Sequence, residues 1–89
     1  MTDVITKNRK EIDALTEELV ILIARRDALV KEMALIKHHY NIPLADETRK
    51  AHLEKLCEEL AIKHNADPKL VKQINSMLIE SVKQKYGKE

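Results

Sequence analysis

Two cationic side chains lie in line with a stripe of apolar residues that a helix would bury. Arg26 and Lys37 are eleven positions apart. At 100° per residue they lie within about 20° of each other and about 16 Å apart along a helix axis. Both side chains are long enough to reach one point between them. A guanidinium and an ammonium that converge on one point bind carboxylates and stabilise negative charge that develops on a ligand.

The later apolar segments carry polar residues on the same kind of face. Arg49 begins the stripe of the second segment, and Ser81 continues the stripe of the third. Gln84 and Lys85 follow Ser81 one turn further along. Any one of these side chains alone is best interpreted as reaching solvent from the edge of a helix. Several buried cations without buried anions are costly, however, so the set predicts a pocket for a small ligand with more than one carboxylate.

Arg9 belongs to the same segment as Arg26 but lies too far from it to line the same pocket. The two arginines are seventeen positions apart, which is about 25 Å along a helix. A small pocket within one chain therefore cannot contain both. An antiparallel partner helix would bring Arg9 of a second copy to Arg26, so the spacing favours a pocket shared between two chains.

The segment that carries these residues predicts one long helix. It runs from about Asp3 to Tyr40 without Gly or Pro, and Pro43 places a break at Ile42. Its apolar residues recur at helical spacing: Ile5, Ile12, Leu15, Leu19, Leu22, Leu29, Met33 and Ile36. Such a helix is about 50 Å long, whereas a compact globule of this chain length has a radius of gyration of about 12 Å. The rest of the chain cannot cover it, and the simplest cover is a second copy related by a two-fold axis.

Start and stop signals divide the remainder of the chain into two shorter helices. Asp46 is a good N-cap for a helix that runs to about Lys63. Asp67-Pro68 is the strongest start signal in the chain, for a helix that reaches about residue 86. The sequence thus predicts an all-α fold with three helices per protomer, one long and two shorter, in a single domain over residues 1–89.

The composition excludes several other classes of protein. Sixteen Lys and Arg against fifteen Asp and Glu give a formal charge of +1, without the basic excess typical of nucleic-acid binders. The longest apolar run, residues 19–24, is too short to span a membrane, and no signal-peptide pattern starts the chain. One Cys cannot form a disulfide framework. We therefore expect a cytoplasmic protein without nucleic-acid or membrane partners.

The histidines and the cysteine raise the question of a metal site. Cys57 lies five positions after His52 and seven before His64, and neither is a strong ligand spacing. Surface histidines and a half-buried cysteine are the better interpretation. A single Gly also excludes a glycine-rich phosphate loop. The sequence predicts neither a metal nor a cofactor.

Three stretches of the sequence together match the pattern of a known enzyme family. The first helix contains Arg9-Lys10-Glu11-Ile12-Asp13-Ala14-Leu15, then Ala24-Arg25-Arg26, then Lys37. Asp46 precedes Arg49 by three at the start of the second helix, and the third helix contains Ile79-Glu80-Ser81-Val82-Lys83-Gln84. With these residues the chain resembles, over nearly its whole length, the all-helical chorismate mutases. The resemblance implies an intertwined homodimeric helical bundle of three-helix protomers.

The resemblance also implies how the cationic residues share the substrate, which is the dicarboxylate chorismate. Arg26 and Arg49 would bind its carboxylates from one protomer, and Arg9 would do so from the other. Ser81 would assist a carboxylate. Each homodimer would then have active sites to which both copies contribute.

Other residues are implied to face the ether oxygen and the hydroxyl of chorismate. Lys37 would donate a hydrogen bond to the ether oxygen, and Gln84 is the candidate for the second donor. Asp46 would lie beside the substrate hydroxyl and contribute through its backbone. Lys37, Arg26 and Gln84 would then be the catalytic residues. The substrate-binding set would comprise these three with Arg9, Asp46, Arg49, Lys50 and Ser81.

The chain departs from the family pattern at two places. Where the family has Glu directly after the arginine of the second helix, this chain has Lys50. A Glu there accepts a hydrogen bond from the substrate hydroxyl, and an ammonium cannot accept one. The family's Ser and Gln are four positions apart, whereas Ser81 and Gln84 are three apart. Either Lys85 takes the place of the Gln, or Gln84 does and Ser81 is displaced by one position, since both spacings share a helix face.

The implied reaction is the rearrangement of chorismate to prephenate in phenylalanine and tyrosine biosynthesis. The chain is then an isomerase that needs no nucleophile, metal or cofactor. It would hold a dianion in a compact geometry and stabilise charge on the ether oxygen. Two alternatives stay open. One is an isochorismate pyruvate-lyase, which has the same fold, and the other is a non-catalytic helical dimer with a decayed pocket, for which Lys50 is the reason.

Overall fold

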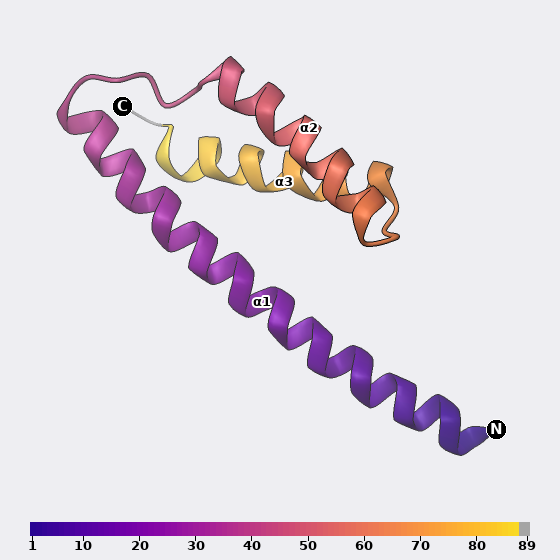
Figure 1. The fold of residues 1–89 in the computed structure, drawn as a ribbon. Helices are drawn as coiled ribbons and strands as arrows, with labels where there is room; N and C mark the ends of the chain where they lie inside the picture. Colours follow the sequence, from indigo (N-terminus) through magenta and orange to yellow (C-terminus); the bar gives the residue numbers. More distant parts are fainter. Residues whose placement is uncertain (88–89) are drawn as a thin grey trace. The chain divides into compact units, whose positions relative to one another are not determined.

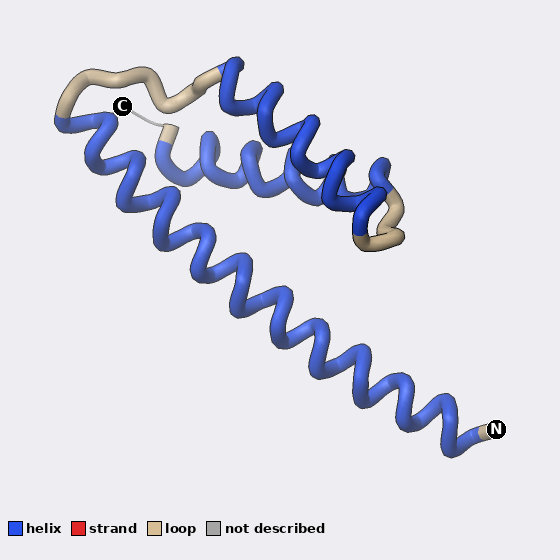
Figure 2. Tube along the Cα trace, in the orientation of Figure 1, coloured by secondary structure: helices blue, strands red, loops and turns tan. Residues whose placement is uncertain are grey.

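Three α-helices make up the regular structure of residues 1–87, which are the residues that the computed structural model describes. α1 is Thr2–His39, α2 is Glu47–Lys63 and α3 is Pro68–Tyr86. Figure 1 labels the three helices, and Figure 2 shows loops between them and no strand within this range. The predicted all-α fold with one long and two shorter helices is confirmed.

The chain forms two compact units, and the boundary between them lies inside α1. The first unit is Met1–Glu32, almost all of which is helix. The second unit begins at Met33 and contains the last turns of α1, all of α2 and all of α3. Arg9 and Arg26 lie in the first unit, and the other predicted site residues lie in the second.

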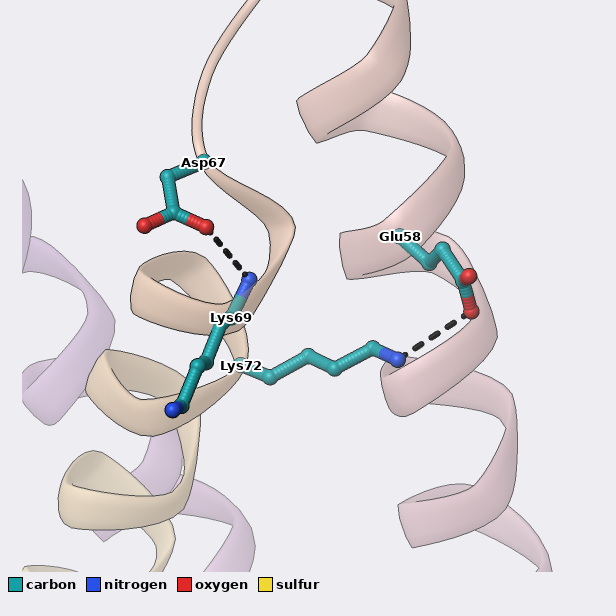
Figure 3. A network of polar contacts seen from close by, with 4 residues as sticks. All are labelled: Glu58, Asp67, Lys69 and Lys72. Atoms are coloured by element: carbon teal, nitrogen blue, oxygen red, sulfur yellow. Dashed lines mark hydrogen bonds and ion pairs between the residues drawn. The ribbon is translucent and has the colours of Figure 1, made fainter.

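Within the second unit, α2 and α3 pack against each other. Ala61 of α2 is buried, as is Ala34 of α1, and no other residue of the described chain is buried to the same degree. Glu58 Oε2 and Lys72 Nζ form an ion pair of 3.1 Å between α2 and α3 (Figure 3). Both of its side chains are about half exposed, so the ion pair contributes little to stability.

Both shorter helices begin at an aspartate N-cap, as the sequence predicts. The Asp46 carboxylate accepts a hydrogen bond of 3.1 Å from the Arg49 amide. The Asp67 carboxylate accepts one of 3.0 Å from the Lys69 amide (Figure 3). These bonds satisfy amide groups that have no acceptor within the helix. Pro68 opens α3, at a position where the helix needs no N–H.

A left-handed asparagine ends α1. Asn41 has φ 56°, and its amide donates to the His38 carbonyl at 3.3 Å. The Ile42 amide donates to the Lys37 carbonyl at 2.8 Å. This pair of bonds is the Schellman pattern, which requires a left-handed residue just after the helix. From Pro43 we expect the helix to break at Ile42, whereas in the structure the chain has already left the helix at Asn41. Asparagine is a residue type that tolerates the left-handed conformation.

The other turn between helices has the same geometry. Asn65 has φ 57°, its amide donates to the Ile62 carbonyl at 3.3 Å, and the Ala66 amide donates to the Ala61 carbonyl at 2.8 Å. α2 therefore ends in a second Schellman pattern with asparagine at the left-handed position. The two asparagines form a matched pair, one after α1 and one between α2 and α3.

Large apolar side chains of the first unit are exposed. Those that this unit carries on α1 have relative exposures that range from 45% to 63%. They are Val4, Ile5, Ile12, Leu15, Leu19, Val20, Ile21, Leu22, Ile23 and Leu29. Extensive exposed apolar surface marks an interaction surface. The first unit by itself therefore leaves the apolar residues of its helix exposed.

Candidate functional site

Lys37 lies in the last turn of α1, and it is half-buried. Its Nζ donates a hydrogen bond of 3.3 Å to the carbonyl of Leu44, in the loop between α1 and α2. An ammonium has three N–H donors, so two remain for a ligand. The loop thus restrains the side chain while its charge stays available for binding.

One side-chain contact joins the end of α1 to the end of α3 within the second unit. His38 Nε2 is 3.0 Å from the carbonyl oxygen of Tyr86, the last residue of α3. The last turn of α3 also carries Gln84 and Lys85, both of which are exposed. The contact therefore links the helix turn that carries the two candidate second donors to the helix end that carries Lys37. These are the residues that the resemblance associates with the ether oxygen.

The start of α2 carries Asp46, Arg49 and Lys50, all of which are exposed. The Asp46 carboxylate accepts from the Arg49 amide, and the Asp46 carbonyl accepts a hydrogen bond of 3.0 Å from the Lys50 amide. The cap thus occupies one oxygen of the Asp46 carboxylate, and the first turn of α2 occupies the Asp46 carbonyl. The cap also fixes where the Arg49 and Lys50 side chains leave the helix.

Ser81 is half-buried on α3, next to the face that packs within the second unit. Half-buried residues recur at helical spacing along this helix: Val71, Lys72, Asn75, Leu78, Ile79, Ser81, Val82 and Tyr86. At 100° per residue, Ser81 lies about 60° from Gln84 and about 40° from Lys85. Both residues thus stay on the side of α3 that carries Ser81, and both stay candidates for the second donor.

Arg9 and Arg26 both belong to α1, which runs without a break through the first unit. Arg26 is half-buried and Arg9 is exposed. Seventeen residues at 1.5 Å per residue separate them by about 25 Å. An unbroken helix cannot bring both guanidinium groups into one small pocket. A site that uses both arginines therefore needs two chains, as the sequence predicts.

Three features around Lys37 are not predicted from the sequence. They are the hydrogen bond to the carbonyl of Leu44, the contact of His38 with the carbonyl of Tyr86, and the left-handed conformation of Asn41. Backbone carbonyls of distant elements leave no trace in a residue pattern. Asn41 differs, because an asparagine just after a helical stretch and two positions before a proline is typical of a left-handed helix end. That signal is present in the sequence.

Other kinds of site find no support in the described range. In residues 1–87, no three His, Cys, Asp or Glu side chains gather closely enough to hold a metal ion. Cys57 is a free thiol and is half-buried. None of the helices described is long and apolar enough to cross a membrane.

Comparison with known proteins decides the family. The family model described as chorismate mutase type II matches residues 8–85, a range that contains every predicted site residue. This chain belongs to the chorismate mutase type II family. A relative, the chorismate mutase of Methanocaldococcus jannaschii, is 32% identical over 80 residues, which are 90% of this chain and 81% of that protein. No solved structure matches the chain.

Membership of the chorismate mutase type II family confirms the main expectations from the sequence. The resemblance to all-helical chorismate mutases is confirmed, and so is the assignment of the chain as an isomerase with chorismate mutase function. The all-helical structure agrees with that family. The roles of individual residues and the pairing of two copies stay predictions.

Proposed function

We propose that two copies of this chain form a homodimer with two active sites, in each of which residues of both copies bind chorismate and convert it to prephenate. The observation that carries the proposal is the match to the chorismate mutase type II family over residues 8–85. That range contains the whole cationic set that the apolar stripes single out. We propose further that the chain acts as one catalytic domain.

The exposed apolar face of α1 supports the second copy. Leu15, Leu19 and Leu22 keep 56–58% of their surface exposed in the single chain. Full burial of a leucine stabilises a fold by roughly 1.5–3 kcal/mol, so covering a long apolar stripe offsets the entropy lost on association. A two-fold axis places this face against itself, and antiparallel α1 helices bring Arg9 of one copy toward Arg26 of the other.

Three arginines bind the two carboxylates of the substrate in this proposal. Arg26 and Arg49 come from one copy and Arg9 comes from the other, while Ser81 adds a hydrogen bond to a carboxylate. A guanidinium presents paired N–H groups that match the geometry of a carboxylate. Holding both carboxylates keeps the dianion in the compact, chair-like shape that the rearrangement needs, which lowers the barrier through orientation.

The rearrangement needs no group that attacks the substrate. The C–O bond at the ether oxygen breaks while a C–C bond forms within the same molecule, and no proton or electron passes to the enzyme. Negative charge develops on the ether oxygen as the C–O bond breaks. Lys37 donates a charged hydrogen bond to that oxygen, with Gln84 as second donor. Preorganised donors of this kind stabilise the transition state more than the bound substrate.

The proposal also covers the contact with the substrate hydroxyl and the place of the reaction in the cell. Asp46, whose carboxylate caps α2, meets the hydroxyl through its backbone, as the resemblance to the family implies. Prephenate then serves phenylalanine and tyrosine biosynthesis. We place the chain in the cytoplasm, which suits its single cysteine and its free thiol.

An absorbance assay with the purified chain tests the proposed reaction. At saturating chorismate, we expect its absorbance to disappear at least about 10⁶ times faster than in buffer, which is the low end of enzymatic acceleration. Isochorismate in the same assay separates the lyase alternative, whose products are salicylate and pyruvate. A chorismate rate equal to that in buffer would overturn the proposal. If an intact dimer also failed to bind a dicarboxylate in calorimetry, the non-catalytic alternative would be favoured.

Restoring the family's glutamate after Arg49 is expected to raise activity. Lys50 is exposed in the first turn of α2, and its ammonium cannot accept a hydrogen bond from the substrate hydroxyl. Lys50→Glu should raise kcat/KM for chorismate about tenfold, because a hydrogen bond to a charged group contributes roughly 1.5–3 kcal/mol. Steady-state kinetics measure this gain.

The matched control for this change is Lys50→Ala, which removes the ammonium without supplying an acceptor. It should gain much less activity than Lys50→Glu. An equal gain in both variants would show that the ammonium is harmful in itself and that the hydroxyl needs no acceptor here.

A further inference from the structure

The corner between α1 and α2 folds back onto the residue to which the proposed function gives the central catalytic role. The backbone reverses at Asn41, whose φ is 56°. The Ile42 amide then donates to the Lys37 carbonyl at 2.8 Å, and the Lys37 Nζ donates to the Leu44 carbonyl at 3.3 Å. Both the main chain and the side chain of Lys37 are thus held by the short loop that begins at Asn41.

This double attachment matters because a lysine side chain is flexible. It has four rotatable bonds, and an unrestrained ammonium loses rotamer entropy when it must meet a single ligand atom. A hydrogen bond that already selects the rotamer removes part of that cost before substrate binds. The Leu44 carbonyl takes one ammonium proton and leaves two donors for the ligand.

We propose that Asn41 is a positioning residue for Lys37. Its left-handed backbone directs the loop so that the Leu44 carbonyl lies within reach of the Lys37 ammonium, which is then held ready for the ether oxygen of the substrate. The proposal rests on the catalytic role proposed for Lys37. Asn41 itself touches no reacting atom in this account, and it acts only through the path of the chain.

The residue type at position 41 follows from the conformation. Glycine and asparagine adopt positive φ readily, whereas alanine meets a steric penalty there. Alanine at this position therefore favours a different exit from α1. The Leu44 carbonyl then moves away from Lys37, and the ammonium samples more rotamers. The helix itself, which ends at His39, stays intact.

Asn65, in the turn between α2 and α3, provides a control for the effect of the backbone substitution on stability. Asn65 has the same left-handed φ, 57°, and its two backbone hydrogen bonds have the same lengths as those at Asn41. The loop after Asn65 carries none of the proposed site residues. Asn65→Ala therefore imposes the same backbone penalty without touching the path from α1 to α2.

The experiment compares full-length wild-type chain with Asn41→Ala, Asn41→Gly, Asn65→Ala and Lys37→Ala. Each is assayed for kcat and KM with chorismate, and each is unfolded with urea. We expect Asn41→Ala to lose about tenfold in kcat with little change in KM, because misplacing a catalytic group affects the chemical step and the arginines still bind the substrate. Asn41→Gly should keep wild-type kcat. Asn65→Ala should shift the urea midpoint by a similar amount to Asn41→Ala and keep wild-type kcat.

The remaining outcomes separate this inference from the proposed function. If Lys37→Ala loses activity but Asn41→Ala matches Asn65→Ala in kcat, the inference is overturned and the role of Lys37 stands. If Asn41→Gly loses as much kcat as Asn41→Ala, the inference is also overturned, since the amide side chain and not the backbone would matter. If Lys37→Ala keeps wild-type kcat, the catalytic role of Lys37 fails and the positioning role fails with it.

Discussion

Lys37→Ala is expected to lose about a thousandfold in kcat/KM for chorismate. The substitution removes the only positively charged donor that the proposal assigns to the ether oxygen, and charged donors are stronger than neutral ones. Most of the loss should appear in kcat, because the charge on the ether oxygen exists only as the C–O bond breaks. KM should change less, since the arginines hold the carboxylates. Steady-state kinetics with purified variants measure both constants.

Lys31→Ala is the matched control for this loss. Lys31 is exposed on α1 six positions before Lys37, which places it about 120° away around the helix. It carries the same charge on the same helix, so its removal tests whether the net positive charge of the chain drives the effect. Lys31→Ala should keep wild-type kcat/KM. An equal loss in both variants, at equal helix content by circular dichroism, would contradict a specific role for Lys37.

The three helices could be predicted from the sequence because their signals are local. An N-cap needs only an aspartate whose carboxylate accepts a hydrogen bond from the backbone amide two or three positions later. Asp46 and Asp67 both accept such a bond. The apolar period of 3.6 residues fixes each helix between those ends. Pro43 predicts the end of α1 to within a few residues, although the chain reverses at Asn41. Local chemistry thus sets where each element begins and ends.

The site could be predicted only in part, because its parts meet through contacts between distant elements. From its residue type and its helix face, Lys37 is predicted to be a cation on an apolar stripe. In the structure, Lys37 is half-buried. Its restraint depends on a carbonyl seven positions later, and a carbonyl is present at every residue. The contact between His38 and Tyr86 spans 48 positions. Neither contact has a residue-type signature from which spacing alone could find it.

Mixing two inactive variants is expected to restore activity. Arg9→Ala and Arg26→Ala should each lose about a thousandfold in kcat/KM, because each removes a guanidinium from a buried carboxylate. In a mixed dimer, one site receives Arg26 from the first chain and Arg9 from the second, and is intact. The other site receives neither. With random exchange from equal amounts, half of the dimers are mixed and half of their sites work, so about one quarter of wild-type activity should return.

A second mixture tests which chain supplies each arginine. Arg26→Ala mixed with Arg49→Ala is the matched control, since the proposal takes both residues from the same copy. Each site of that mixed dimer lacks one arginine, so no activity should return. Native mass spectrometry of differently tagged chains establishes that exchange has occurred in both mixtures.

The length of α1 determines how the results of the two mixtures are interpreted. Because the helix is unbroken from Thr2 to His39, Arg9 and Arg26 stay about 25 Å apart on every copy, whatever the arrangement of the other helices. Recovery in the first mixture and none in the second requires a site that two copies build together. If proven exchange restored no activity in the first mixture, each arginine would serve its own chain or none, and the shared pocket would have to be abandoned.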